Sequence, residues 1–420
     1  MFIWVLLCFI CMVNFEKFNR HWVNGFFYPF EKKRDYFEVL VNHMKKKQII
    51  ALTGIRRTGK TVLFKQLINH LINEDVSRKN ILYFSFDEQK PSIDELIKEY
   101  CQATSLELGK DRIFIFLDEV QKLNDWQNQV KTYYDNYENI KFFVSGSATL
   151  FIHKKAHESL AGRVFLLDLP VLSFKEFLKF KDKAEFVNNP KMFSSQIQSE
   201  FSIYLKRGFI DIINEDDEFT KEYLQGIINK IAFEDIPQLF SVENPEKLKA
   251  LIIAIYSSPG MLINYENLGK DLGLSSKTIE KYLFYLTQAK IVKKVYNYGK
   301  NFLTSEKKSK KVYITAPCMC FLNDEVEISK VIENLVCVAG NFDFFWRTPQ
   351  KEEIDFISKK DSVIVPIEVK YANRINPKDL NAIQKFSKKN KTSLAIIITK
   401  DTEQISGETK MIPAWKWLLQ

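Results

Sequence analysis

The sequence predicts an α/β protein whose first domain is built on a doubly wound parallel sheet, and three observations support this prediction. An apolar run at 48–52, a glycine-containing loop at 54–61 and apolar residues at helical spacing after it indicate a strand, a loop and a helix. A second apolar run, at 113–117, ends in two adjacent carboxylates. Strand-like and helix-like segments alternate as far as residue 169, which is typical of a parallel sheet with its site at the carboxyl ends of the strands.

Length and composition indicate a globular protein of several domains. The chain has 420 residues, more than one hydrophobic core usually holds, and 46% of them are hydrophobic. A net charge of +9 permits contact with nucleic acid without requiring it. The six cysteines are scattered, and the Cys8–Cys11 pair lies in an apolar run without a second pair, so we expect reduced thiols.

The first 13 residues are almost wholly apolar. This run is too short to span a bilayer, and it lacks the basic start and the small-residue cleavage site of a secretory signal. We therefore expect a cytoplasmic protein, and weak membrane association through the N-terminal run stays open.

The loop at 54–61 carries the most specific chemistry. It reads Gly-Ile-Arg-Arg-Thr-Gly-Lys-Thr, the G-x-x-x-x-G-K-T pattern of a P-loop. The two glycines allow a tight turn that directs backbone N–H groups toward phosphates at a helix N-terminus. Lys60 would reach the β and γ phosphates, and the Thr61 hydroxyl would hold Mg²⁺. The pattern predicts ATP and Mg²⁺ as cofactors, bound through Gly54, Arg57, Thr58, Gly59, Lys60 and Thr61.

Asp118 and Glu119 form a second group of candidate site residues, at the end of the predicted buried strand 113–117. Asp118 would hold the Mg²⁺ of the nucleotide through water, and Glu119 would orient or deprotonate the attacking water. Buried strands also end in acids for structural reasons alone. The position of the pair after a P-loop and one further strand-helix unit favours the catalytic interpretation.

Three other residues are catalytic candidates. The strand 141–144 ends in Ser145-Gly146-Ser147, where either serine would sense the γ-phosphate or the water, although a simple turn explains them as well. Arg163 precedes the strand 164–167 and is a candidate for stabilising transition-state charge, in cis or from a neighbouring subunit of a homo-oligomer. An exposed surface arginine is the alternative.

Together, these motifs resemble a prokaryotic AAA+-related P-loop ATPase family whose members carry a C-terminal domain of unknown function. The segments that carry the resemblance are 54–61, 116–121, 145–147 and 160–163 before 172–177. The resemblance implies a fusion of an ATPase, a winged helix and a restriction-endonuclease-like domain. The predicted parts are an apolar extension (1–30), the ATPase core (31–170), a helical lid or connector (171–244), a winged helix (245–311) and an endonuclease-like α/β domain (312–420).

The winged-helix region presents basic residues. Ser275 or Ser276 can cap a third helix that turns Lys277 and Lys281 outward. The stretch from Lys290 to Lys311 holds eight lysines and one acid, as a wing beside phosphates would. These lysines predict double-stranded DNA as a partner. A winged helix that contacts protein, with a solvated lysine loop, is the alternative.

The C-terminal region contains a second set of carboxylates. Asp355 lies on one strand, and Glu368 and Lys370 share one face of the next. This arrangement looks like the D…ExK core of restriction-endonuclease-like nucleases, with Glu333 matching the helix acid often present there. The four residues therefore predict a divalent-ion site that activates water. A structural ion pair between Lys370 and a carboxylate is the alternative.

Three functions follow from these observations. The first is an ATP-hydrolysing protein whose nucleotide state controls winged-helix and nuclease-like modules that act on DNA. The second is a nuclease for which ATP is a switch. The third is a nucleotide-regulated scaffold or antitoxin-like protein that binds a protein partner and carries an inactive nuclease-like domain.

Overall fold

The computed structural model describes residues 13–147, 160–299, 302–360, 363–372, 375, 380–390 and 392–420. Cys8, Cys11 and nearly all of the apolar N-terminal run lie outside the described residues. The chain divides into two compact units, Met1–Leu169 and Pro170–Gln420. The division falls one residue before the end of the predicted ATPase core.

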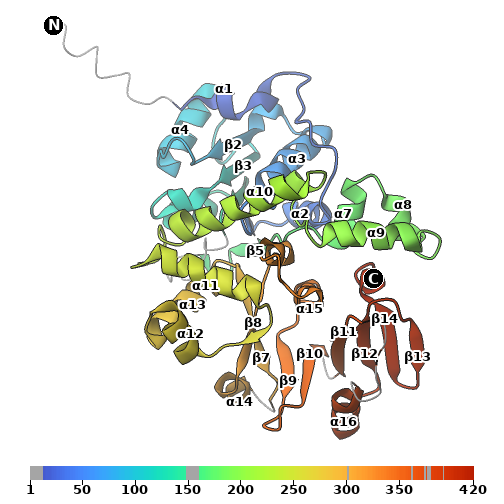
Figure 1. The fold of residues 1–420 in the computed structure, drawn as a ribbon. Coiled ribbons are helices and arrows are strands. Elements are labelled where there is room, and N and C mark those ends of the chain that lie inside the picture. Colours follow the sequence, from blue (N-terminus) through green and yellow to red (C-terminus); the bar gives the residue numbers. More distant parts are fainter. Residues whose placement is uncertain are drawn as a thin grey trace, which may run out of the picture. The chain divides into compact units, whose positions relative to one another are not determined.

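A parallel sheet forms the centre of the N-terminal unit, as predicted (Figure 1). Its order is β2-β3-β4-β1-β5, and every described strand pair in it is parallel. The carboxyl ends of all these strands therefore lie at one edge of the sheet. The strands are β1 (Ile49–Thr53), β2 (Ile81–Ser85), β3 (Ile113–Asp118), β4 (Ile140–Ser145) and β5 (Val164–Asp168).

Helices cover both faces of this sheet because its strands are apolar on both sides. Alternate residues of β1 face opposite sides of the sheet. Ile50 and Leu52 pack in the hydrophobic core beside α2 and α3, whereas Ile49 and Ala51 pack in the core beside α4 and α5. The helices are α1 (Phe15–Phe18), α2 (Tyr36–Met44), α3 (Lys60–Asn73), α4 (Ile93–Thr104) and α5 (Trp126–Asn136).

The C-terminal unit begins with a run of helices. Side chains cap several of them at the start. A capping box begins α7, Asx caps begin α10, α11 and α12, and the Ser275 hydroxyl accepts a hydrogen bond from the Thr278 N–H at the start of α13. The helices are α7 (Phe174–Phe180), α8 (Ala184–Asn188), α9 (Ser194–Tyr204), α10 (Asp217–Lys230), α11 (Pro245–Ser257), α12 (Tyr265–Leu272), α13 (Ser276–Gln288), α14 (Phe302–Lys307), α15 (Ile328–Ala339), α16 (Asn381–Asn390) and α17 (Ala414–Trp417).

A mixed sheet of order β13-β14-β12-β11-β10-β9-β7-β8-β6 runs through this unit. Parallel pairing of β7 with β9, at Tyr296 and Phe344, joins the hairpin of β7 and β8 to the C-terminal strands. The boundary predicted between 311 and 312 therefore falls inside β8. The strands are β6 (Met261–Leu262), β7 (Val292–Asn297), β8 (Lys310–Ile314), β9 (Phe344–Arg347), β10 (Glu353–Lys360), β11 (Val363–Lys370), β12 (Ala395–Thr399), β13 (Gln404–Ser406) and β14 (Thr409–Pro413).

One hydrophobic core extends from the first helices of the C-terminal unit to its last strands. Phe177 of α7 and Phe201 of α9 belong to the same buried cluster as Val295, Phe356 and Trp415. The predicted connector is thus part of the same packed body as the C-terminal strands. In the described part of the chain, no helix has both the length and the hydropathy needed to cross a membrane.

Candidate active site

The P-loop connects the end of β1 to the start of α3 through a backbone that requires glycine. Gly54 has a φ of 147°, and a Cβ atom there would lie 2.4 Å from the Leu169 carbonyl oxygen. Gly59 is the N-cap of α3 and has a φ of 96°. Arg57 adopts a left-handed conformation, with a φ of 67°. The loop therefore makes the tight turn predicted from its two glycines.

Side chains hold the P-loop in place. The Lys60 ammonium donates hydrogen bonds to the carbonyl oxygens of Gly54 and Ile55, both at 3.0 Å. The Thr58 hydroxyl donates to the Ile55 carbonyl at 2.9 Å, and Arg34 donates to the Thr58 carbonyl at 2.8 Å. These bonds place a buried ammonium inside the loop, next to the N-terminus of α3, where backbone N–H groups favour a phosphate.

Asp118 lies beside the P-loop at the end of β3, and hydroxyl groups surround its carboxylate. The Thr61 hydroxyl donates to Oδ2 at 2.6 Å, and the Tyr83 hydroxyl donates to the same oxygen at 2.9 Å. The Ser145 hydroxyl donates to Oδ1. Thr61, Asp118 and Ser145 were all predicted from the sequence as site residues, and the parallel register of β3 and β4 brings the last two together.

Glu119 follows Asp118 in a left-handed conformation, with a φ of 53°. Such a φ is uncommon for a residue other than glycine and is found more often at functional sites. The Gln121 amide donates to the Glu119 carboxylate at 2.5 Å. Burial raises the pKa of Glu119, the Asp118 carboxylate raises it further, and Lys60 opposes both effects. Glu119 is thus a basic carboxylate between the end of β3 and the P-loop lysine.

The other two predicted catalytic residues, Ser147 and Arg163, lie at opposite edges of the sheet. Ser147 is half-buried in the turn after β4, and this turn lies beside the end of β1 because the Gly146 N–H donates to the Leu52 carbonyl. Arg163 lies at the opposite edge of the sheet, where its carbonyl accepts from the Ile49 N–H and its guanidinium binds Asp135 at 2.8 Å.

This position corrects the prediction that Arg163 acts in cis. The five residues of β1 separate it from the P-loop by about 16 Å, at roughly 3.3 Å per residue, which exceeds the length of an arginine side chain. A role at the site of a neighbouring subunit stays a prediction.

Three residues of this site were not predicted from the sequence: Tyr83, Arg34 and Gln121. Tyr83 lies within an apolar strand and appears to be an ordinary core residue until β2 is paired with β3. Burial raises the pKa of its hydroxyl well above the ordinary value, and Asp118 adds to this effect, so Tyr83 stays a hydrogen-bond donor. Arg34 precedes α2 and gives no sequence signal for a contact with the loop.

The carboxylates predicted as a second site also lie together, in the C-terminal unit. Asp355 of β10 and Glu368 of β11 are on antiparallel neighbours, and each carboxylate accepts a backbone N–H from the other strand, at 2.9 and 3.3 Å. The Lys370 ammonium lies 2.7 Å from Glu368. Glu333, on α15, is 4% exposed and accepts a hydrogen bond from the Tyr313 hydroxyl at 2.6 Å.

A lysine that was not predicted to be there enters this cluster. The Lys311 ammonium lies 3.0 Å from Glu333, 2.6 Å from Glu353 and 3.7 Å from Asp355. Lys311 is 2% exposed, so the prediction that the whole stretch from Lys290 to Lys311 faces DNA is wrong at this residue. Among the described residues, no group of three or more His, Cys, Asp and Glu side chains has an arrangement that could hold a metal ion.

Burial and mutual charge shift the pKa values in this cluster. Burial raises the pKa of Asp355 well above its ordinary value, and Glu333 and Glu368 add to the effect. Burial would also raise the pKa of Glu333, but Lys311 and Lys330 lower it overall. Burial would lower the pKa of Lys311, yet the carboxylates of Glu333, Asp355 and Glu353 raise it, so this lysine stays charged.

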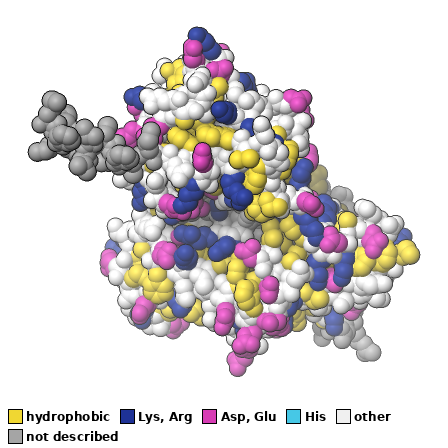
Figure 2. Space-filling model, turned by 90° about the horizontal axis from the view of Figure 1, so that it is seen from above, with side chains coloured by type: hydrophobic (Ala, Val, Ile, Leu, Met, Phe, Trp, Pro, Cys, Tyr) yellow, Lys and Arg dark blue, Asp and Glu magenta, His cyan; other side chains and the backbone are white. Residues whose placement is uncertain are grey.

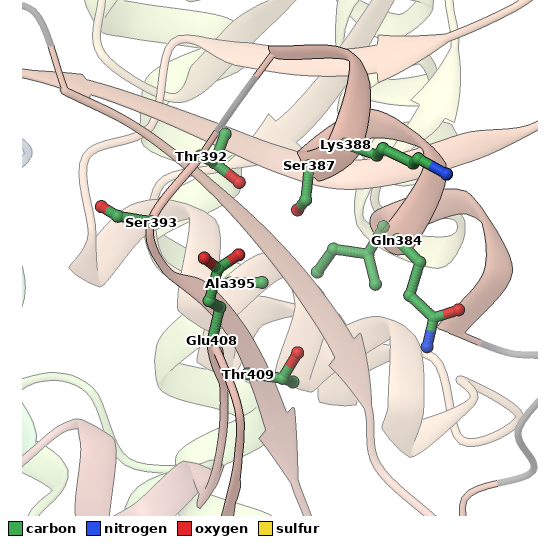
Figure 3. Close-up of a pocket in the computed structure, with 9 residues that line it drawn as sticks. Gln384, Ser387, Lys388, Thr392, Ser393, Ala395, Glu408 and Thr409 are labelled. Atoms are coloured by element: carbon green, nitrogen blue, oxygen red, sulfur yellow. The ribbon is translucent and has the colours of Figure 1, made fainter.

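A separate cavity of about 510 Å³ lies between α16 and the strands β12 and β14. Figure 3 shows Ser387 and Thr392 on one side of this space and Glu408 on another. The two hydroxyl oxygens are buried without a hydrogen-bond partner. None of the site residues predicted from the sequence lines this cavity.

Comparison with known proteins places the P-loop unit in context. Residues 46–178 match the family described as AAA domain. This part of the chain is similar to AAA-type P-loop domains, and we refer to the unit that contains it as the AAA domain. Two further families, described as Domain of unknown function (DUF8612) and Domain of unknown function (DUF4143), match residues 204–320 and 329–417. Neither description assigns a function to these residues.

Two similar proteins are described as uncharacterized. A protein of Methanocaldococcus jannaschii is 27% identical over 407 residues, which cover 89% of this chain and 88% of that protein. A protein of Haemophilus influenzae is 24% identical, over 92% of this chain and 98% of its own length. Among solved structures, the Aeropyrum pernix ORC1 protein in complex with DNA is 12% identical over 76% of this chain and 96% of its own, with a TM-score of 0.34. That score is too low to carry a functional argument.

Proposed function

We propose that the chain hydrolyses ATP in the presence of Mg²⁺ at the P-loop of its AAA domain. The observation that carries this proposal is the Asp118 carboxylate, which the Thr61 hydroxyl at the N-terminus of α3 contacts at 2.6 Å. A hydroxyl and a carboxylate side by side, next to a P-loop lysine, are the ligand types that hold Mg²⁺ on a nucleoside triphosphate.

Each residue then has one role. The loop N–H groups and Lys60 bind the β and γ phosphates, and Thr61 and Asp118 hold Mg²⁺, which neutralises charge on the phosphate oxygens. Glu119 accepts a proton from the attacking water, a role that its raised pKa favours. Ser145 fixes the orientation of Asp118 through its hydrogen bond to Oδ1. Ser147 senses the γ-phosphate, and Arg163 acts only on a neighbouring subunit.

The variant Glu119→Gln tests the hydrolytic role. It should bind Mg²⁺-ATP normally and turn it over at least ~100-fold more slowly, the usual scale for a lost general base. Lys60→Ala is the matched control, because it should lose nucleotide binding itself. Normal turnover in Glu119→Gln would show that another group activates the water. ATP binding without turnover in the natural chain would favour the nucleotide-regulated scaffold.

We also propose that α13 contacts double-stranded DNA. The helices α11, α12 and α13 are followed by the hairpin of β7 and β8, and β6 pairs with β8, an order that supports a winged helix. Lys277 and Lys281 are exposed on α13, with Glu280 exposed between them. Because Glu280 lies between these lysines, we expect a local contact with DNA and not a broad basic surface. On the face drawn in Figure 2, basic side chains are interspersed with acidic ones.

The wing lysines contribute less to this surface than the sequence predicted. Lys293 forms an ion pair with Asp343 at 3.0 Å, and Lys310 forms one with Glu306 at 2.8 Å. We therefore expect the double variant Lys277→Ala/Lys281→Ala to lose most of the DNA affinity. The slope of log K against log salt should fall by about 2, or roughly 1 per phosphate contact. Lys221→Ala, which removes a lysine paired with Asp324, is the control. Affinity that does not depend on salt in the natural chain would favour a protein partner.

A further inference from the structure

The carboxylate cluster of the C-terminal unit already contains a cation, and that cation is part of the chain. The Lys311 ammonium lies within 4 Å of three carboxylates, on Glu333, Glu353 and Asp355. These carboxylates come from α15 and β10, whereas Lys311 comes from β8. The lysine therefore lies among the side chains that the sequence predicted to surround a divalent ion.

Charge in the cluster is formally balanced. Its four carboxylates are those of Glu333, Glu353, Asp355 and Glu368. Among the described residues, four basic groups contact them, because Lys330 pairs with Glu333, Arg347 with Glu353, and Lys370 with Glu368, in addition to the contacts of Lys311. A divalent ion added to this set would bring two uncompensated charges into a buried region.

The space around Lys311 is also filled. Gly260 packs so closely on Glu333 that a Cβ atom at this position would lie 2.9 Å from the Glu333 carboxylate oxygen. The Tyr313 hydroxyl takes up another bonding position on the same oxygen. A metal ion needs carboxylate oxygens at about 2.0–2.2 Å on several sides, and here those oxygens bond to Lys311, Tyr313 and backbone N–H groups.

We infer that Lys311 takes the place of the divalent cation in this cluster, which is a closed ion-pair network and not a metal site. The network joins β8 to α15 and to the strands β10 and β11. The predicted metal set of Glu333, Asp355, Glu368 and Lys370 does not fit a metal while Lys311 is present. Removing the ammonium converts the same carboxylates into a site for a divalent cation.

Binding of Mn²⁺ to the full chain, freed of metal and without nucleotide, tests this inference. Free Mn²⁺ is followed by electron paramagnetic resonance in the natural chain, Asp355→Asn, Lys311→Ala and the double variant Lys311→Ala/Asp355→Asn. The natural chain and Asp355→Asn should bind the same amount of Mn²⁺. Lys311→Ala should bind one additional Mn²⁺ ion per chain, and the double variant should not bind this ion. Mn²⁺ should therefore raise the unfolding temperature of Lys311→Ala more than that of the other three proteins.

Two outcomes would overturn the inference. One is a Mn²⁺ ion bound by the natural chain and lost in Asp355→Asn, because lysine and metal would then share the cluster. The other is a folded Lys311→Ala protein that gains no Mn²⁺. If Lys311→Ala does not fold, the double variant Lys311→Ala/Glu353→Gln takes its place in the experiment, because it removes one charge of each sign. The comparison of the natural chain with Asp355→Asn needs no variant of Lys311 and decides the first outcome alone.

Discussion

Two groups of buried carboxylates in the described part of the chain are held by different kinds of partner. Asp118 of the AAA domain accepts hydrogen bonds from the hydroxyls of Thr61, Tyr83 and Ser145. The carboxylates of the C-terminal unit instead bind ammonium and guanidinium groups, with Lys311 among them. A hydroxyl donates a hydrogen bond to a carboxylate oxygen but does not neutralise its charge. An ammonium donates hydrogen bonds and also neutralises the charge.

This difference separates a site that can take a cation from one that has an internal cation. A carboxylate held by neutral donors keeps a full negative charge for an incoming Mg²⁺. A carboxylate paired with lysine contributes to the free energy of folding, and losing one partner leaves a buried charge without compensation. Three carboxylates near one another are therefore weak grounds for a metal site until their donors are known.

The largest expected effect is on folding. Lys311→Met should lower the free energy of unfolding of the C-terminal unit by about 3–5 kcal/mol, the usual cost of breaking a buried ion pair from one side. Lys330→Met is the control, because Lys330 pairs with the same Glu333 but its side chain is 47% exposed, so its loss should cost at most about 1 kcal/mol.

Hydrogen exchange of the backbone amides in β8 and β10 measures both variants, because it reports on the opening of the C-terminal unit separately from that of the AAA domain. Equal protection in the two variants would mean that Lys311 is no more strongly coupled to the carboxylates than a surface lysine. The comparison between the two clusters would then fail.

The second effect is on turnover, with folding unchanged. Asp118→Asn keeps the shape of the side chain but removes the charge that holds Mg²⁺, so ATP hydrolysis should fall at least ~100-fold, because a metal supplies several kcal/mol of charge stabilisation. The thermal unfolding midpoint should stay near that of the natural chain or rise. A large loss of stability would place Asp118 in the same class as the carboxylates around Lys311.

Local patterns allowed much of the AAA domain to be predicted. The apolar runs of β1 and β3, the glycines at 54 and 59 and the carboxylates at 118 and 119 are each defined within a few residues, and the structure places them close together. In contrast, the position of Lys311 depends on the pairing of Tyr296 with Phe344, which joins segments far apart in sequence.

Residues that face the clusters from elsewhere could not be predicted for the same reason. A lysine in a lysine-rich stretch is normally solvated, and nothing within a few residues of Lys311 indicates that α15 and β10 will surround it. Arg163 is a different case. It precedes the strand 164–167, and a residue before a strand of a parallel sheet lies at the amino edge, opposite the carboxyl ends that form the site, so its distance from the P-loop followed from the predicted sheet. The position of Lys311 instead depended on the pairing of distant strands.

The smallest expected effect isolates a single neutral donor to Asp118. Tyr83→Phe removes the hydroxyl that donates to Oδ2 at 2.9 Å and leaves the aromatic ring in the core. A hydrogen bond to a charged group is worth about 1.5 kcal/mol at the low end, so kcat/KM for Mg²⁺-ATP should fall about tenfold. Tyr133→Phe is a matched control in the same unit, because the Tyr133 hydroxyl donates to Asp94 at 2.8 Å, and Asp94 belongs to α4, away from the P-loop. Both variants lose one tyrosine–aspartate hydrogen bond, but only Tyr83→Phe should lose ATPase activity. If the two variants hydrolyse ATP equally well, the Tyr83 hydroxyl only fills a bonding position on Asp118, and the orientation of this carboxylate depends on Thr61 and Ser145.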